Sequence, residues 1–424
     1  MISKEFRLTL LGLCILITGV GNMFAQEKVD LPDPYETKSV VRYCKVLGWP
    51  EGIAPVAPTG FRVTKFAEGF HNPRWAYVAP NGDVFISEAG SLPPDELDQQ
   101  ALDNAKSQNL GSTNLIVMFR DADKDGIYES RYTYMTGLRQ PLGMLVLGNY
   151  FYVANTDGLV RYPYSSSDTK IEAEGQKIVE LPAGGYNNHW TRNIIANSDG
   201  SKIYISVGSA SNNAEYGMDE EYRRANILEV NPDGSGEVFY ATGLRNPVGM
   251  GWNPVTGQLW TVVNERDELG DELVPDYACS VQRGGFYGWP YAYFGANEDP
   301  RMKGQRPDLV ARTIIPEIPF TSHSATLGMT FYNADKFPAR YRNGLFVTQH
   351  GSWNRSNLVG YKVLFIPFQD GKPAGEPEDF LTGFMANESN SEVYGRPVGI
   401  TVLPDGSLLV MDDAAKTIWQ VSTM

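Results

Sequence analysis

The sequence predicts an all-β chain folded as a six-bladed β-propeller. Three observations support this: a two-strand pattern that recurs six times, a composition rich in glycine, proline and aromatic residues, and no long amphipathic helical pattern. The 424 residues include 43 Gly, 27 Pro, 8 Trp, 23 Tyr and 19 Phe. This content of apolar and turn-forming residues excludes disorder and is typical of β-rich folds.

Each repeat consists of a glycine-containing turn, an apolar alternation, a tight turn and a second alternation. Alternation with a period of two predicts a strand, and pairs such as Asn81-Gly82 and Asp405-Gly406 predict tight hairpin turns. Repeats spaced by about 60 residues and made of strands are typical of a propeller. The six repeats span residues 69–90, 137–154, 184–208, 243–263, 323–348 and 395–411.

The N-terminus predicts export. Lys4 and Arg7 precede an apolar run over residues 8–20 that is too short for a membrane-spanning helix, and Ala25 offers a small residue for cleavage. We therefore expect residues 1–25 to be a secretory signal peptide. The mature chain is expected in the periplasm or outside the cell, with no stable insertion into the membrane.

The remaining chain divides into an N-terminal extension, residues 26–60, and the propeller, residues 61–424. Its two cysteines, Cys44 and Cys279, are far apart in the sequence, which leaves open whether they pair. No CxxCH motif for covalent haem is present. The formal charge of −14 argues against nucleic acid as a partner, because such binding depends on Lys and Arg at phosphates.

Polar residues stand just before the first strand of five repeats. In a propeller such equivalent positions converge on the central channel, so we expect a polar funnel there. The alternative is that these residues only cap strand ends that face solvent. The residues are Gln140, His189, Arg245-Asn246, His323-Ser324 and Arg396.

His189 is the predicted general base, because an imidazole titrates near neutral pH. A hydrogen-bonded structural histidine is the alternative. Arg245, Arg355 and Arg396 carry forked donors that suit carboxylates or phosphates. On an acidic chain these arginines favour a small anionic ligand.

Two acidic segments suggest calcium. Residues 264–277 follow the fourth repeat, and their carboxylates predict either a calcium site or a solvated loop. Residues 120–130 have the DxDxDG spacing of a calcium loop, but Tyr132 stands where an EF-hand has its bidentate Glu. We expect a hairpin turn there that binds calcium weakly if at all.

Five motifs resemble the glucose/sorbosone dehydrogenase family, soluble quinoproteins that use pyrroloquinoline quinone (PQQ). The similarity runs over roughly residues 60–422. It is closer to the sorbosone-dehydrogenase-like branch than to the soluble glucose dehydrogenase branch. The motifs are GLRNPVG (243–249), NERDELGDELVPDY (264–277), GGFYGWPY (284–291), QHGSWNRS (349–356) and GRPVGI (395–400).

The resemblance implies a six-bladed propeller and a set of site residues. His189, Gln140 and Arg245 would be catalytic. The implied and candidate PQQ contacts are Gln140, Arg245, Asn246, Trp289, His350, Arg355 and Arg396. The predicted calcium region comprises Glu265, Arg266, Asp267, Asp271 and Tyr287.

The sequence departs from the soluble glucose dehydrogenases at three points. Asn188 replaces the aspartate before the catalytic histidine, and an amide can orient the imidazole but cannot raise its basicity. The quinone-contacting lysine has no clean counterpart, with His350 and Arg355 as the candidates. Of a C-terminal pair of cofactor arginines, only Arg396 remains.

The function implied is oxidation of a hydroxyl of an aldose, sorbosone or related sugar. His189 would take the hydroxyl proton, a hydride would pass to the quinone beside calcium, and the electrons would leave to an external acceptor. Two alternatives are a calcium-dependent propeller lactonase and a non-catalytic propeller that binds a glycan or a protein.

Overall fold

The computed structural model describes residues 30–91, 111 and 113–424, of which Leu31–Met424 form one compact unit. Within the described residues, six sheets have four or five strands each, and the helical elements are very short. The prediction of an all-β chain is therefore confirmed. The helical elements are η2 (Pro300–Met302), α2 (Pro307–Val310) and η3 (Ala339–Tyr341).

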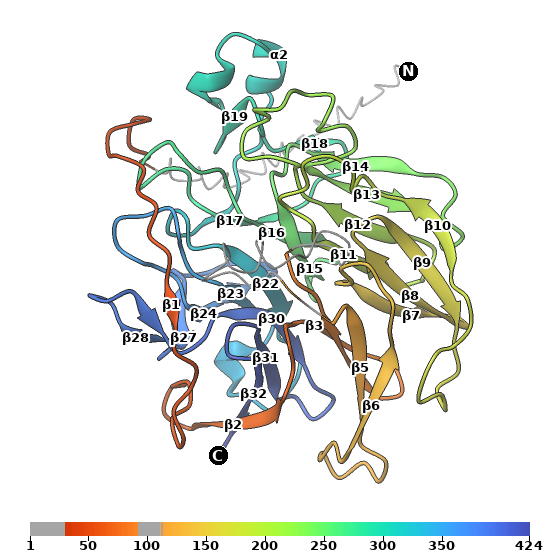
Figure 1. Cartoon of the computed structure of the whole chain (residues 1–424). Coiled ribbons are helices and arrows are strands. Elements are labelled where there is room, and N and C mark those ends of the chain that lie inside the picture. Colours follow the sequence, from red (N-terminus) through yellow and green to blue (C-terminus); the bar gives the residue numbers. More distant parts are fainter. Residues whose placement is uncertain (1–29, 92–110, 112) are drawn as a thin grey trace, which may run out of the picture. The chain divides into compact units, whose positions relative to one another are not determined.

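The first three sheets follow one another along the chain (Figure 1). The first contains β3 (Pro73–Val78), β4 (Val84–Glu88), β5 (Leu115–Arg120) and β6 (Ser130–Met135). The second contains β7 (Met144–Leu147), β8 (Tyr150–Asn155), β9 (Gly158–Pro163) and β10 (Gln176–Glu180). The third contains β11 (Arg192–Ala196), β12 (Ile203–Val207), β13 (Asn226–Val230), β14 (Val238–Thr242) and, parallel to β14, β18 (Gly285–Phe286).

The last three sheets are built in the same way, except that the sixth combines both ends of the unit. The fourth contains β15 (Pro247–Trp252), β16 (Leu259–Val263), β17 (Tyr277–Ser280) and β21 (Ile318–Pro319). The fifth contains β22 (Thr326–Phe331), β23 (Leu345–Gln349), β24 (Lys362–Ile366) and β27 (Glu378–Leu381). The sixth contains β30 (Pro397–Val402), β31 (Leu408–Asp412), β32 (Thr417–Thr423) and β2 (Phe61–Glu68).

Each of the six sequence repeats forms the first hairpin of one of these sheets. The first strands of the sheets also contact one another in a closed order, β3-β7-β11-β15-β22-β30 and back to β3. Residues at or just before the start of these strands therefore lie around the same part of the molecule, as the sequence repeats predict.

Glycines in the first strands allow this close approach. A Cβ atom on Gly328 in β22 would lie 2.4 Å from the carbonyl oxygen of Val398 in β30. A Cβ on Gly399 in β30 would lie 2.6 Å from the carbonyl oxygen of Arg74 in β3. No side chain fits at such distances, so the glycine in motifs such as PVG is required by the neighbouring strand.

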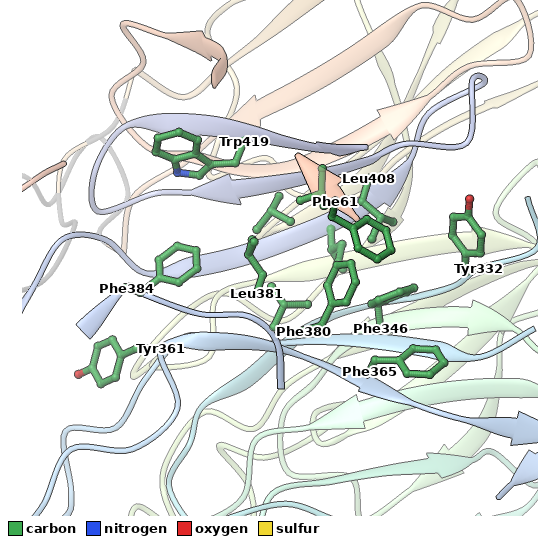
Figure 2. Packing of buried hydrophobic residues seen from close by; sticks show 14 of the residues in the cluster. Phe61, Tyr332, Phe346, Tyr361, Phe365, Phe380, Leu381, Phe384, Leu408 and Trp419 are labelled. Carbon is green, nitrogen blue, oxygen red and sulfur yellow. The ribbon is translucent and has the colours of Figure 1, made fainter. Parts of the chain in front are cut away.

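The sixth sheet closes the chain, because β2 pairs antiparallel with β32 from Phe61↔Thr423 onward. The cluster around Phe61 fills the space between the fifth and sixth sheets (Figure 2). Phe61 and Phe337 meet edge to face at 4.7 Å, and Phe346 and Phe380 at 4.6 Å. Aromatic pairs of this geometry bury large apolar areas and fix the packing of the two sheets.

The N-terminal segment 31–60 belongs to the same compact unit as the sheets. Its strand β1 (Lys45–Val46) pairs in parallel with β29 (Glu392–Val393), which pairs with β28 (Met385–Asn387). Trp49 packs against the ring of Trp419 at 5.2 Å. Two further hairpins complete the elements, β19 (Ala292–Tyr293) with β20 (Asn297–Glu298) and β25 (Phe368–Gln369) with β26 (Lys372–Pro373).

Cys44 and Cys279 are both buried and free, so they do not form a disulfide. No helix in the described part of the chain is long and apolar enough to cross a membrane. The predicted signal peptide, residues 1–25, lies outside the described residues.

Candidate functional site

A cavity of about 230 Å³ lies where the first strands begin. Five of the six sheets contribute a wall residue from the start of their first strand or from just before it. These residues are Arg74, His189, Arg245, Ala325 and Arg396. The cavity thus brings together three residues that the sequence placed at strand starts, namely His189, Arg245 and Arg396.

His189 is held as a neutral imidazole. Its Nδ1 lies 2.9 Å from both the carbonyl and the hydroxyl oxygen of Ser209. That hydroxyl donates to the carbonyl of Ser211 at 2.6 Å, so both Ser209 oxygens act as acceptors and we assign the proton to Nδ1. Burial, followed by the positive charge of Arg245, lowers the pKa of His189 well below 6.5. Nε2 is therefore unprotonated and able to accept a proton.

Arg245 is a buried guanidinium fixed on three sides. Its Nε donates to the carbonyl of Asn212 at 3.0 Å, and its Nη2 to Asn212 Oδ1 at 2.9 Å. Its Nη1 donates to the carbonyl of Asn264 at 3.2 Å. Nη2 also lies 3.5 Å from Asp267 Oδ2. These bonds fix the direction of the guanidinium at the cavity wall.

Asp267 is held between two cations. Besides its contact with Arg245, its Oδ1 lies 3.1 Å from His323 Nδ1, and His323 Nε2 lies 2.8 Å from the carbonyl of Gly270. Both ring nitrogens of His323 thus face acceptors. Burial acts to lower the pKa of His323, but Asp267 outweighs it and raises the pKa above 6.5. His323 therefore stabilises the carboxylate from behind the cavity wall.

A second cluster lies on another part of the wall. Asp413 forms a short salt bridge with Arg74, and its Oδ1 lies 2.8 Å from His350 Nε2. Arg396 donates from Nε to the carbonyl of His350 at 3.0 Å. Burial, then the charge of Arg396, lowers the pKa of His350 to about 4, so this ring is also neutral.

The cavity is cationic in an acidic chain. Three guanidinium groups line it, against two carboxylates, Asp267 and Asp413. Arg74 Nε is buried and has no hydrogen-bond partner among the described residues. A buried donor without a partner is costly unless a ligand satisfies it, so this wall suits an anion.

Three other predicted residues are buried next to the wall but do not line the cavity. Gln140 Nε2 donates to the carbonyl of Gly90 at 3.0 Å, beside the lining residue Ser91. Trp289 Nε1 donates at 3.0 Å to the carbonyl of Asn212, which also holds Arg245. Asn246 follows Arg245, and its buried Oδ1 has no described partner. Their roles remain predictions.

Glu265 and Arg266 lie in a buried ion network. Arg266 contacts Glu265 Oε2 at 2.9 Å and Asp299 Oδ2 at 3.1 Å. The second oxygen of Glu265, Oε1, is buried without a hydrogen-bond partner in the described structure. An acceptor in that state suits a bound cation.

The remaining predicted residues have other partners. Tyr287 donates to the carbonyl of Ser280 at 2.7 Å. Asp271 accepts from the backbone N–H of Ser356 at 3.1 Å, and Arg355 forms a short salt bridge with Glu272. Tyr287, Asp271 and Arg355 do not line the cavity, and their proposed contacts with metal or cofactor remain predictions.

The second acidic segment lies between β5 and β6 and forms the expected hairpin connection. Oxygens of Asp121, Asp123, Asp125 and Glu129 all lie within 4.8 Å of one another. Glu129 therefore stands near the three aspartates, at a position outside the EF-hand pattern. Calcium binding here remains a prediction.

The sequence reasoning missed Arg74, Asp413 and Ser209. Arg74 follows Pro73 in the first repeat, where other repeats have an apolar residue after the proline, as at Leu142 and Val248. An arginine at a position that is apolar in the other repeats could have indicated a functional residue. Asp413 and Ser209 follow strands and gave no comparable signal, because their contacts with Arg74 and His189 arise only in the folded chain.

These features make the cavity a candidate small-molecule site with a cationic wall and a neutral histidine. The chain belongs to the TrAA12-like family, whose model matches residues 55–276 and 302–424. The resemblance seen in the sequence is therefore confirmed. So is the prediction of an oxidoreductase acting on CH–OH donors, the class to which named relatives belong.

The individual relatives have low sequence identity to this chain. The chain is 29% identical over 300 residues to an uncharacterized protein of Borreliella burgdorferi, covering 68% of this chain and 77% of that one. It is 24% identical over 304 residues to a pyrroloquinoline quinone-dependent sugar dehydrogenase of Hypocrea jecorina, covering 65% and 64%. A calcium structure of Trichoderma reesei family AA12 superposes with a TM-score of 0.68 at 17% identity, covering 92% and 100%. That structural match shows a shared fold.

Proposed function

We propose that this protein is a PQQ-dependent dehydrogenase that oxidises a hydroxyl of an aldose, sorbosone or related sugar and passes the electrons to an external acceptor. The observation that carries the proposal is one cavity that combines the unprotonated Nε2 of His189 with the buried guanidinium of Arg245. Membership of the TrAA12-like family and similarity to a PQQ-dependent sugar dehydrogenase support it.

The cavity wall fits PQQ, a flat o-quinone with three carboxylates. Three arginines line it, and the unpartnered Nε of Arg74 is a donor that an anion would satisfy. When bound, PQQ supplies the redox chemistry by accepting the hydride. We assign its binding to Arg74, Arg245 and Arg396, with Gln140, Asn246, Trp289, His350 and Arg355 as further candidates.

We also propose calcium as a second cofactor, held in the region of Glu265 and Asp267. The unpartnered Oε1 of Glu265 supports this, because calcium prefers carboxylate and carbonyl oxygens. The similar calcium structure of family AA12 adds support. Arg266, Asp271 and Tyr287 remain candidates for the surrounding shell, and the ion would supply Lewis acidity.

The chain's own chemistry follows from two side chains. His189 would accept the hydroxyl proton at Nε2, while Ser209 keeps the proton on Nδ1. Arg245 would stabilise negative charge on the sugar oxygen, since its guanidinium is fixed before the substrate arrives. Asn188 lines the cavity beside His189 and can orient groups there without raising the basicity of the imidazole.

We further propose that the six sheets are the blades of a six-bladed β-propeller spanning residues 61–424. The closed order of first strands and the pairing of β2 with β32 support this. The signal-peptide pattern supports export of the mature chain, and N-terminal sequencing of secreted protein tests it.

The test of the proposed function mixes the purified mature protein with PQQ and calcium and follows dye reduction. The panel contains aldoses, sorbosone and simple alcohols. Reduction that requires both PQQ and a sugar supports the proposal. Lactone hydrolysis with calcium alone would replace it by a lactonase, and absence of both PQQ binding and turnover would favour a binding protein.

A further inference from the structure

We infer that Tyr43 and Trp353 form a saccharide-stacking subsite at the rim of the cavity, which holds the sugar ring next to the one oxidised at His189. The inference rests on the proposed function and names oligosaccharides as the favoured substrate class. It also gives the N-terminal segment a role in substrate binding.

The two aromatic rings form a near-parallel pair at the cavity. Both residues line it, with ring centroids 5.9 Å apart and planes inclined by 13°. Their exposed fractions are 49% for Tyr43 and 37% for Trp353, whereas His189 in the same cavity is 8% exposed. The pair is therefore a solvent-exposed part of the cavity wall, whereas His189 is a buried part of it.

The backbone around Tyr43 is fixed although its ring is exposed. The N–H of Arg42 donates to the carbonyl of Trp353 at 2.7 Å, which joins the N-terminal segment directly to the other aromatic residue. The Arg42 guanidinium donates to the carbonyl of Ser356 at 2.7 Å and to the hydroxyl of Ser391 at 2.6 Å. On the other side, Cys44 is buried.

Trp353 is fixed in the same manner. Its neighbours Ser352 and Asn354 are 0% and 2% exposed. The hydroxyl of Ser352 accepts from the N–H of Val359 at 2.9 Å, and Asn354 Oδ1 accepts from the N–H of Glu268 at 3.2 Å. The loop thus presents the indole toward solvent from an ordered backbone, which lowers the entropy cost of binding.

This arrangement suits a pyranose ring. A sugar presents C–H groups on its faces and hydroxyls at its edges, while tyrosine and tryptophan combine an apolar face with a polar edge. Within the described residues, neither the Tyr43 hydroxyl nor Trp353 Nε1 donates to a protein acceptor. The arginines that suit carboxylates lie elsewhere on the wall, so the aromatic pair remains available for an uncharged ring.

The test measures KM for glucose, cellobiose, cellotriose, maltose and maltotriose with enzyme loaded with PQQ and calcium. For the wild type, we expect the KM for either cellotriose or maltotriose to be about tenfold below the KM for glucose. Tyr43→Ala and Trp353→Ala should each remove most of this difference. Tyr43→Phe should keep it. Tyr150→Ala is the matched control, because Tyr150 is likewise 37% exposed but does not line the cavity.

Two further measurements separate this inference from the proposed function. Calorimetric titration of the PQQ-free protein with both trisaccharides should show binding that the two alanine variants lose, even if no sugar is oxidised. Titration with PQQ should be the same in wild type and variants. Equal KM values and equal binding heats in wild type and alanine variants would overturn the subsite, and a parallel loss of PQQ affinity would assign the rings to the cofactor instead.

Discussion

His189 Nδ1 lies 2.9 Å from the carbonyl oxygen of Ser209, and this contact decides which ring nitrogen carries the proton. The Ser209 hydroxyl is itself a donor to Ser211, so Nδ1 faces two acceptors. The imidazole is thereby fixed in the tautomer that leaves Nε2 basic. A loop that follows β12 thus sets the tautomer of a residue that precedes β11.

His189→Gln should strongly reduce dye-linked sugar oxidation, with kcat lowered by about 10²–10⁴ because the proton acceptor is lost. The glutamine side chain retains polarity, so the thermal unfolding midpoint and PQQ titration should change little. His71→Gln is the control, since His71 is exposed and lies outside the cavity. Unchanged turnover in His189→Gln would remove the residue from the role of base.

The pH dependence of kcat/KM should reflect the lowered pKa of His189. The active form is neutral, so this group supports activity at every pH above its pKa and loses it as pH falls through that value. Burial and Arg245 place the pKa of His189 well below 6.5. Protonation of His189 should therefore not lower kcat/KM between pH 8 and pH 6.5. An acidic limb centred near pH 6.5 that is absent from His189→Gln would contradict the assignment.

Arg245→Lys should weaken PQQ binding while the positive charge remains. A lysine cannot keep the forked bonds to Asn212 and Asn264, and hydrogen bonds to charged groups contribute about 1.5–3 kcal/mol each. We expect the Kd for PQQ to rise about tenfold to a hundredfold by fluorescence titration. Arg283→Lys changes a guanidinium that is 60% exposed and should leave the Kd as it is.

The sequence predicted the first hairpins well, because period-two alternation and Asn-Gly or Asp-Gly turns are local signals. It did not predict outer strands such as β21, which has two residues and no alternation of its own. The pairing of β2 with β32 joins residues at opposite ends of the unit, and nothing local specifies that partner.

The same distinction applies to the site. His189, Arg245 and Arg396 stand at equivalent places in the repeats, so their meeting at one cavity followed from the repeat pattern. Asp413 reaches the cavity through contacts with Arg74 and His350, which are 339 and 63 residues away. Tyr43 lies outside the repeats altogether. Such tertiary contacts depend on packing, which a single sequence pattern does not encode.

Calcium should stabilise the wild-type protein against heat, and Glu265→Gln should lose this effect. A ligand that binds the folded state raises stability by mass action, and Glu265 Oε1 is the unpartnered acceptor proposed to bind the ion. The measurement is the shift of the unfolding midpoint between chelated and calcium-saturated samples.

Asp299→Asn is the matched control for that experiment. Both substitutions remove one of the two carboxylates that contact buried Arg266, and Arg266 keeps the other, so both should lower the free energy of unfolding. Only Glu265→Gln should lose the calcium-dependent shift. A shift of the same size in both variants would place calcium away from Glu265.

Gly328→Ala should destabilise the fold through the contact between neighbouring first strands. The added Cβ would lie 2.4 Å from the carbonyl oxygen of Val398, so β22 and β30 would have to separate. Overpacking of this kind costs about 1–3 kcal/mol and should lower the thermal unfolding midpoint by several degrees. Gly184→Ala is the control, because no heavy atom lies within 4 Å of its added Cβ. The same measurement on Gly399→Ala extends the test to the contact between β30 and β3. Equal unfolding midpoints for Gly328→Ala and Gly184→Ala would mean that the close approach of the first strands does not hold the sheets in their closed order.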